Sequence, residues 1–490
     1  MFDKLGYLTV SLGLFISFYC PAIAWASEGP TSKTPVATND DGAEKPLTAE
    51  DVKGNWLGTI NAGVVKLRLG FAVVGTKPEQ LKVRMFSVDQ GNAEIPVDVI
   101  KLDANKVSMQ LTKISATFQG TWNSQTNEIA GNWKQGAQSF PITLKKVESL
   151  PNAGRPQDPS KPYPYLEEDV TFTNAKHNVT LKGTLTQPKG SGPFPAVVLI
   201  SGSGPQDRNE EIAGHRPFLV LADALTRRGI AVLRFDDRDF EKPDELFKAT
   251  SEDLSHDVLA AVSFLRARPQ IAATKIGLVG HSEGGLIAPM LASRDKEIAL
   301  IVMIAGPGVS GDVILNRQQD MMRERAGVSE ATRAKDRATS QEWFDIIKAE
   351  PDNAQATKKI EAAFEKSHPE SDAAEKDALK IGVKTLLTPW FRFFISYDPQ
   401  PALTNVKCPV LAVIGEKDLQ VPAAQNLKVI EAALKAGGNK NFLAKELPGL
   451  NHLLQPCVTG FLDEYSTIET TIDPDALKLI SDWIVARMSK

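Results

Sequence analysis

The chain reads KIGLVGHSEGG from Lys275 to Gly285, and this stretch decides the fold. Its first half is an apolar strand pattern, and its glycines permit a sharp turn from the strand into a helix. In such a turn the hydroxyl of Ser282 projects from the sheet, and the amide of Glu283 points toward a developing oxyanion. A Gly-x-Ser-x-Gly pattern in this context predicts a nucleophile at Ser282 and favours it over a purely structural turn.

Alternating strand and helix patterns surround this turn from residue 166 to residue 490. Apolar strands are predicted at residues 168–173, 179–186, 195–200, 231–235, 275–279, 298–304, 409–414 and 442–447. Helices are predicted at residues 217–228, 255–268, from 284 onward, 422–436 and 474–488. Near-continuous Val, Ile and Leu strands joined by helices predict a mostly parallel sheet with helices on both faces.

One segment, residues 309–402, interrupts this alternation. It has no strand pattern, and charged helical stretches are predicted around residues 318–325, 358–366 and 373–385, followed by the aromatic-rich run Trp390–Phe394. A structureless loop of this length is unusual inside a compact domain, so we expect a helical insertion. Because it lies between two consecutive strands, we expect it to act as a cap over the sheet edge that carries ligands.

A serine nucleophile needs a base, and the base needs a carboxylate that orients it. In this fold the chain order is Ser, then Asp or Glu, then His. Only His368 and His452 follow Ser282; His452 comes directly after the last predicted strand, whereas His368 lies in a charged part of the insertion and is interpreted as solvated. For the acid, Asp418 in the turn before the next helix is favoured over Glu416, which lies nearer the strand.

The second oxyanion donor is expected in the loop Ser201–Arg208, which follows the strand at residues 195–200. Its glycines allow a backbone amide to approach the substrate, and position favours Ser203, with Gly204 as the alternative. A phosphate-binding Gly-x-Gly-x-x-Gly loop is disfavoured because Asp207 occupies the place of the third glycine.

The first half of the chain has a different pattern. Short alternating runs at residues 64–69, 82–86, 106–111 and 142–144, separated by turn signals, predict a small all-β sandwich or barrel over residues 51–148. A Gly-x-Trp unit occurs three times in this half and supplies Trp56, Trp122 and Trp133. We interpret these tryptophans as core residues rather than a ligand-binding platform.

A secretory signal peptide is predicted over residues 1–26. Lys4 precedes the apolar run 8–16, and Ala24 and Ala26 supply the small residues that a signal peptidase reads. An uncleaved membrane anchor is the disfavoured alternative. The protein is therefore expected to be exported, periplasmic or secreted, without stable membrane insertion after cleavage.

Composition shifts give the remaining boundaries. Residues 27–50 have the composition of a flexible leader and residues 149–165 that of a Pro-rich linker, which leaves 166–490 as the α/β domain.

A net charge of −4 gives no electrostatic reason to expect nucleic acid as a partner. Cys408 and Cys457 are expected to be free thiols, and no Cys or His spacing predicts a metal site.

At this point the chain resembles a known group, the two-domain bacterial esterases of the α/β-hydrolase superfamily, sometimes labelled serine aminopeptidase-like hydrolases. The resemblance is carried by five blocks in the expected order, at residues 201–208, 214–218, 280–285, 415–422 and 447–452. It implies an α/β-hydrolase fold with a helical cap insertion, preceded by a small β domain. It also implies hydrolysis of small carboxylic esters by Ser282, Asp418 and His452, with a small-molecule ester as partner and no metal or organic cofactor.

The chain departs from this group at one loop. Relatives carry an Asp-Arg-Gly-x-Gly turn after the strand at residues 231–235, but here the loop at 236–241 lacks both glycines, so pocket shape and substrate preference are expected to differ.

The roles of Asp207, Arg208 and His215 stay open. Two rival functions also stay open: a peptidase acting on short peptides, and a non-catalytic cell-envelope binding protein on a hydrolase scaffold.

Overall fold

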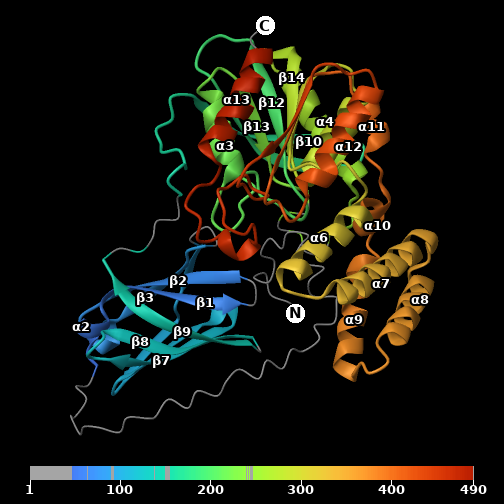
Figure 1. Ribbon diagram of the computed structural model, residues 1–490. Coiled ribbons are helices and arrows are strands. Elements are labelled where there is room, and N and C mark those ends of the chain that lie inside the picture. The colour runs from blue at the N-terminus through green and yellow to red at the C-terminus, as the bar shows by residue number, and fades with distance from the viewer. Residues whose placement is uncertain are drawn as a thin grey trace.

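The computed structural model describes residues 47–62, 65–89, 93–136, 138–148, 150, 155–238, 240, 242, 245 and 247–488. They form two units, each built on its own sheet (Figure 1). The predicted signal peptide and the predicted leader as far as residue 46 lie outside the described residues. The last four leader residues, 47–50, belong to the first unit, since Leu47 is buried and helix α2 (Ala49–Val52) begins behind a capping box at Thr48.

The first unit is one antiparallel sheet of nine strands with the order β4-β3-β2-β1-β9-β8-β7-β6-β5. The strands are β1 (Gly54–Ala62), β2 (Val65–Val74), β3 (Lys82–Ser87), β4 (Ala93–Pro96), β5 (Val99–Asp103), β6 (Lys106–Leu111), β7 (Ala116–Asn123), β8 (Glu128–Gln135) and β9 (Gln138–Val147). Strands from both halves of this order contribute to one apolar cluster, so the sheet curls around its own core. The predicted all-β unit is thus present as a curled sheet with two open edges.

The three tryptophans of this unit lie in that core. Trp56, Trp122 and Trp133 are all buried, and the indole N–H of Trp56 donates to the carbonyl of Val52 at 2.7 Å. This confirms the interpretation as core residues over that of a binding platform.

The second unit contains an eight-stranded sheet with the order β10-β11-β13-β12-β14-β15-β16-β17. Its strands are β10 (Leu166–Asn174), β11 (Val179–Gln187), β12 (Phe194–Ile200), β13 (Ala231–Phe235), β14 (Ile271–His281), β15 (Ile298–Ile304), β16 (Val410–Gly415) and β17 (Phe442–Leu447). Strands β10 and β11 pair antiparallel at one side, and all pairs from β13 to β17 are parallel. Parallel strands end at the same edge, so the loops after β12, β14, β16 and β17 meet there.

Helices cover both faces of this sheet (Figure 1). They are α3 (Pro217–Thr226) and α13 (Pro474–Met488) on one face, and α4 (Ser251–Arg266), α5 (Glu283–Ala292) and α12 (Ala423–Ala436) on the other. Successive strand residues alternate between these layers: Val197 packs in the cluster of α3 and α13, and Val198 in that of α4, α5 and α12. Burial on both faces explains the continuous apolar strands in the sequence.

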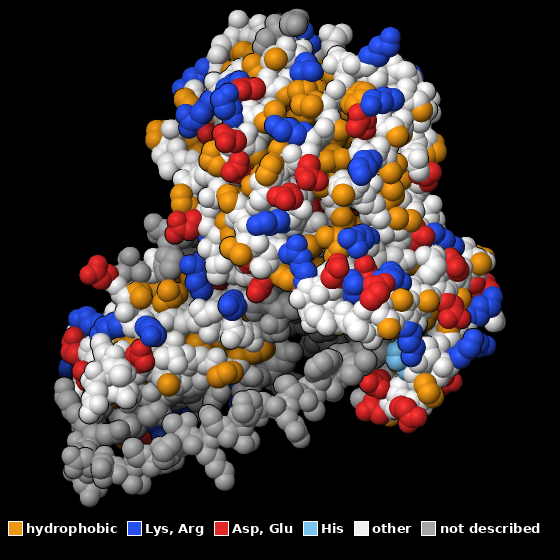
Figure 2. Space-filling view, in the orientation of Figure 1, with side chains coloured by type: hydrophobic (Ala, Val, Ile, Leu, Met, Phe, Trp, Pro, Cys, Tyr) orange, Lys and Arg blue, Asp and Glu red, His pale blue; other side chains and the backbone are white. Residues whose placement is uncertain are grey.

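The segment between β15 and β16 is helical, as its sequence predicts. It holds α6 (Gly311–Arg325), α7 (Glu330–Ala349), α8 (Asn353–Ser367), α9 (Ala373–Leu386), α10 (Pro389–Ser396) and α11 (Gln400–Asn405). Acidic and basic side chains are interspersed over its surface (Figure 2), while aromatic residues such as Trp343, Phe364 and Trp390 form a small core of its own. His368 stacks on Phe364 and is half-buried rather than solvated.

The linker between the two units is packed onto the second one. Arg155 donates to the carbonyl of Ser466, and Gln157 bonds the backbone of both Thr471 and Ile472. These contacts hold the segment that follows Tyr465, a residue of the pocket described below.

Candidate active site

Ser282 stands in a sharp turn between β14 and α5. Its backbone has φ 51° and ψ −116°, a left-handed conformation that a non-glycine residue adopts only under constraint from its surroundings. The constraint is close backbone packing: a Cβ on Gly280 would lie 2.0 Å from the Gly284 carbonyl oxygen, and one on Gly284 would lie 2.1 Å from that of Ile200. The glycines around Ser282 are therefore required by backbone contacts, and Ser282 stays partly exposed at the sheet edge.

We expect Gly280→Ala to lower the free energy of unfolding by at least about 2 kcal/mol, because the opposing atoms are backbone and cannot move aside. Gly327→Ala is the matched control, since φ is +77° there but the space is open, and about 1 kcal/mol is expected from backbone strain alone. Denaturant titration measures both costs. Equal costs would contradict the packing described for the turn.

The structure brings Asp418 and His452 together. The Nδ1 atom of His452 lies 2.8 Å from Oδ2 of Asp418, and the exposed fractions of the two residues are only 3% and 1%. The other carboxylate oxygen, Oδ1, accepts the backbone amides of Gln420 and Val421 at 2.8 Å each. The competing acid, Glu416, is exposed and accepts the amide of Gly449 instead.

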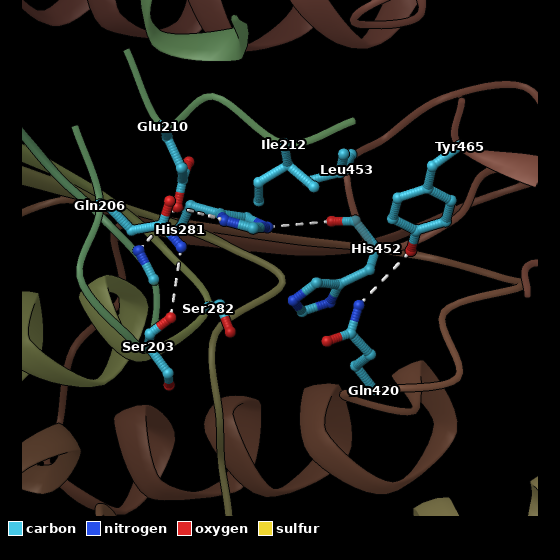
Figure 3. Close-up of a pocket in the computed structure, with 11 residues that line it drawn as sticks. Ser203, Gln206, Glu210, Ile212, His281, Ser282, Gln420, His452, Leu453 and Tyr465 are labelled. Atoms are coloured by element: carbon cyan, nitrogen blue, oxygen red, sulfur yellow. Dashed lines mark hydrogen bonds and ion pairs between the residues drawn. The ribbon is translucent and has the colours of Figure 1, made fainter. Parts of the chain in front are cut away.

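Ser282 and His452 line one pocket, and the His452 ring faces the serine (Figure 3). The pocket measures about 370 Å³, including solvent at its mouth, and is lined by Gly202, Ser203, Gln206, Glu210, Ile212, His281, Ser282, Gln420, His452, Leu453 and Tyr465. No hydrogen bond joins the Ser282 hydroxyl to His452 within the described part of the chain, and such contacts are often long in a free enzyme. None of these lining residues comes from the helical insertion.

The two predicted oxyanion donors come from two different elements: Ser203 lies on the loop after β12, and Glu283 is the first residue of α5. A Cβ on Gly202 would lie 3.2 Å from Cβ of Ser282, so the loop after β12 passes directly beside the nucleophile. The Gly202 amide is already used, because it donates to Oε1 of Glu210 at 2.6 Å. This leaves the amides of Ser203 and Glu283 as candidate donors.

Several lining residues were not predicted from the sequence. Glu210 accepts from His281 Nδ1 at 2.8 Å, and His281 Nε2 lies 3.1 Å from the carbonyl oxygen of His452. Gln420 donates weakly to the hydroxyl of Tyr465 at 3.4 Å. His281 lies inside the nucleophile motif and Gln420 lies two residues after Asp418, so both had a sequence signal, but no motif marks Glu210 or Tyr465.

The side chain of Glu283 is buried behind the turn. Its Oε1 accepts the Ser251 hydroxyl at 2.5 Å and the Trp390 indole N–H at 2.9 Å, which connects the nucleophile turn to α10 of the insertion. Burial raises the pKa of the Glu283 carboxyl, although these hydrogen bonds act to lower it. The insertion thus contacts the site from behind the serine.

From the raised pKa we expect Glu283→Gln to be at least as stable as the wild type at neutral pH. A carboxyl whose pKa is raised in the folded state stabilises the fold while the pH is below 4.5, its ordinary pKa. This stabilisation is lost as the pH rises from 4.5 through the pKa of the folded state. The difference in melting temperature, variant minus wild type, should therefore grow from pH 4.5 upward. A difference that shrinks with pH would show a carboxylate stabilised by its partners instead.

The first two residues of the divergent loop, Asp236 and Asp237, are held by polar contacts. Asp237 accepts the Ser201 hydroxyl and the Gln206 amide, and Asp236 forms a paired contact with the Arg208 guanidinium. This ties the loop to the chain that carries Ser203.

Asp207, Arg208 and His215 do not pair with one another. Asp207 accepts backbone amides of its own loop, and His215 lies between the Thr471 hydroxyl and the Tyr465 carbonyl. Burial lowers the pKa of His215 to about 4, so it is a neutral structural residue at pH 7.

Other predicted features have simple outcomes. Cys408 and Cys457 are free, and burial raises the pKa of the Cys408 thiol to about 12. In the described part of the chain, no helix is long and apolar enough to cross a membrane, and no cluster of three His, Cys, Asp or Glu side chains is arranged for a metal ion.

Known proteins are similar to part of this chain. The family model for the BAAT / acyl-CoA thioester hydrolase C terminal matches residues 259–370, which include Ser282. Esterase EstD of Thermotoga maritima is 40% identical over 147 residues, which are 30% of this chain and 34% of EstD. Part of the chain is therefore similar to esterases and to acyl-CoA thioester hydrolases, on a mostly parallel sheet with helices on both faces.

The chain is also similar to an acyl-CoA enzyme. Acyl-coenzyme A amino acid N-acyltransferase 2 of Rattus norvegicus is 33% identical over 132 residues, 27% of this chain and 28% of that protein. The matches span about a third of the length of these curated relatives. Among solved structures, an esterase of Pyrococcus furiosus aligns with 66% of this chain and 91% of that chain, at 18% identity and a TM-score of 0.40.

Proposed function

We propose that the protein is a serine hydrolase that cleaves carboxylic esters of small acyl groups through an acyl-enzyme on Ser282. The observation that carries the proposal is the buried Asp418–His452 contact of 2.8 Å at the pocket that also holds the strained Ser282. The similarity to EstD supports an ester as the substrate class. The apolar wall of the pocket at Ile212 and Leu453 suits a short acyl chain.

In the proposed reaction Oγ of Ser282 attacks the ester carbonyl, and Nε2 of His452 takes the serine proton. The carboxylate of Asp418 accepts a hydrogen bond from the Nδ1–H of the same ring, which orients the ring and stabilises the imidazolium. The amides of Ser203 and Glu283 stabilise the tetrahedral oxyanion. His452 then protonates the leaving alcohol, and a water activated by the same ring releases the carboxylic acid.

Thioester hydrolysis is the second candidate. The matching family model and the acyl-CoA relatives favour it, because the matched region contains the nucleophile turn. The same Ser282 chemistry would serve, with a thiolate as leaving group that needs less protonation than an alcohol.

Side-by-side kinetics separate the candidates. We expect the highest kcat/KM with p-nitrophenyl acetate or butyrate, lower values with short acyl-CoA thioesters, and the lowest with aminoacyl nitroanilides. Preference for the thioesters would support the second candidate. Faster turnover of the nitroanilides would overturn the esterase proposal in favour of a peptidase, and no turnover of any substrate would favour a binding protein.

We also propose that the protein works outside the cytoplasm, after cleavage behind Ala26. The support is the sequence pattern of residues 1–26. Fractionation of the native host with mass analysis of the mature N-terminus tests it; a full-length chain in the cytoplasm would contradict it.

A further inference from the structure

Two buried polar side chains beside Ser282 have no role as reactants in the proposed mechanism. Glu210 and His281 have exposed fractions of 1% and 4%, and Oε1 of Glu210 lies 2.8 Å from Nδ1 of His281. Burying two such polar groups costs free energy unless hydrogen bonds replace the lost contacts with water. The hydrogen-bond partners of Glu210 and His281 therefore indicate the role of the pair.

Each member of the pair reaches a different catalytic loop (Figure 3). Oε1 of Glu210 also accepts the Gly202 amide at 2.6 Å, immediately before the candidate oxyanion donor Ser203. On the other side, Nε2 of His281 lies 3.1 Å from the backbone carbonyl oxygen of His452, the proposed base. The pair thus links the loop that carries Ser203 to the loop that carries His452. The link passes through His281, which directly precedes the nucleophile Ser282.

The hydrogen-bond pattern also fixes the state of the ring. Both nitrogens of His281 face acceptors, a carboxylate and a carbonyl, so the ring acts as a double donor, which requires an imidazolium. In agreement, burial acts to lower the pKa of His281, but the Glu210 charge and hydrogen bond outweigh it and the pKa is raised.

The backbone of Glu210 is consistent with a fixed position. Its φ is +52°, and its amide donates to the Asp207 carbonyl in a tight turn. A non-glycine residue keeps such a conformation when the surrounding contacts determine it.

We propose that Glu210 and His281 are positioning residues that set the oxyanion loop and the base loop relative to Ser282. This inference rests on the proposed function, because it assigns the pair an effect on ester turnover. Since the pair touches neither the ester carbonyl nor the leaving group in this mechanism, its loss should act on kcat and leave substrate binding nearly unchanged.

Three substitutions at one position test the proposal. Glu210→Ala removes both hydrogen bonds, and Glu210→Asp keeps the charge but withdraws the oxygens by one methylene. Glu210→Gln keeps an oxygen at the place of Oε1, and its NH₂ takes the place of Oε2, which has no hydrogen-bond partner among the described residues. Asp295→Asn is the control, because it removes a carboxylate that pairs with Arg266 at the far end of α5.

We expect Glu210→Ala to lower kcat by about 100-fold with KM changed by less than about 3-fold, as for loss of one oxyanion donor. The inhibition constant of a short trifluoromethyl ketone, whose adduct carries an oxyanion, should rise by the same factor, while that of the product acid stays constant. Glu210→Asp should lose at least about 10-fold in kcat, and the Asp295→Asn control should stay within about 2-fold of wild type. Glu210→Gln keeps the hydrogen bond to the Gly202 amide but removes the charge that faces the His281 imidazolium, so its kcat should fall between those of Glu210→Ala and the wild type.

Wild-type kcat in both Glu210→Ala and Glu210→Asp, or a loss confined to KM in these two variants, would overturn the inference. If Glu210→Ala does not fold, Glu210→Asp decides in the same way. The proposed function fails separately, when the wild type shows no ester turnover that depends on Ser282. If the wild type turns over and the Glu210 variants match it, only the positioning role is wrong.

Discussion

Ser282→Ala should lower kcat for p-nitrophenyl butyrate by at least about 10⁴-fold while the protein keeps its fold. The substitution removes the one oxygen that forms the acyl-enzyme and leaves the backbone amides of Ser203 and Glu283 in place. Those amides and the pocket can still bind substrate, so KM should change little where residual activity is measurable. Steady-state kinetics on purified wild type and variant give the comparison.

Stability is not expected to fall with this change. Ser282 is partly exposed, its hydroxyl has no hydrogen bond to His452 within the described chain, and alanine tolerates the same backbone no worse than serine. An unchanged melting temperature therefore controls for misfolding. Turnover within about 10-fold of wild type in a folded variant would exclude Ser282 as the nucleophile.

Asp418→Asn has the second-largest expected effect, a loss of about 10³- to 10⁴-fold in kcat. The amide oxygen of the variant must take the place of Oδ1, because that position accepts the amides of Gln420 and Val421. The NH₂ group then faces Nδ1 of His452 and donates to it. The ring is held in the wrong tautomer, with its proton on Nε2, and cannot accept the serine proton.

The matched control for this variant is Glu416→Gln. Glu416 lies two residues away on the same loop, but it is exposed, and among the described residues its side chain has one hydrogen bond, from the Gly449 amide. We expect its kcat to stay within about 2-fold of wild type. A large loss at Glu416 with a small loss at Asp418 would exchange the roles of the two carboxylates.

The sequence was most informative where chemistry and fold depend on the same residues. The glycines around Ser282 are required because a Cβ at either position would lie about 2 Å from a backbone atom, so the turn has a sequence pattern that identifies it. Chain order and strand ends then led to His452 and Asp418, which the structure places 2.8 Å apart. The strands of the second sheet could be recognised for a similar reason. Helices cover both faces of this sheet, so successive residues of its central strands are mostly buried and these strands are mostly apolar.

The residues that the sequence did not predict act through long-range contacts. Glu210 and His281 are 71 residues apart, and nothing in either local pattern indicates their pairing. The expected cap offers a second example: the helical insertion is present, but it reaches the site through Trp390 behind the serine, and none of its residues lines the described pocket. Such contacts form between residues that are far apart in the sequence, so no local sequence pattern predicts them.

The most direct test of the account is labelling with a fluorophosphonate, which reacts with an activated serine and needs no knowledge of the substrate. We expect one adduct per wild-type chain, mapped by mass spectrometry to the peptide that contains Ser282, and no adduct on Ser282→Ala. Equal labelling of both proteins, or no labelling of the folded wild type, would contradict the assignment of Ser282 as the catalytic nucleophile.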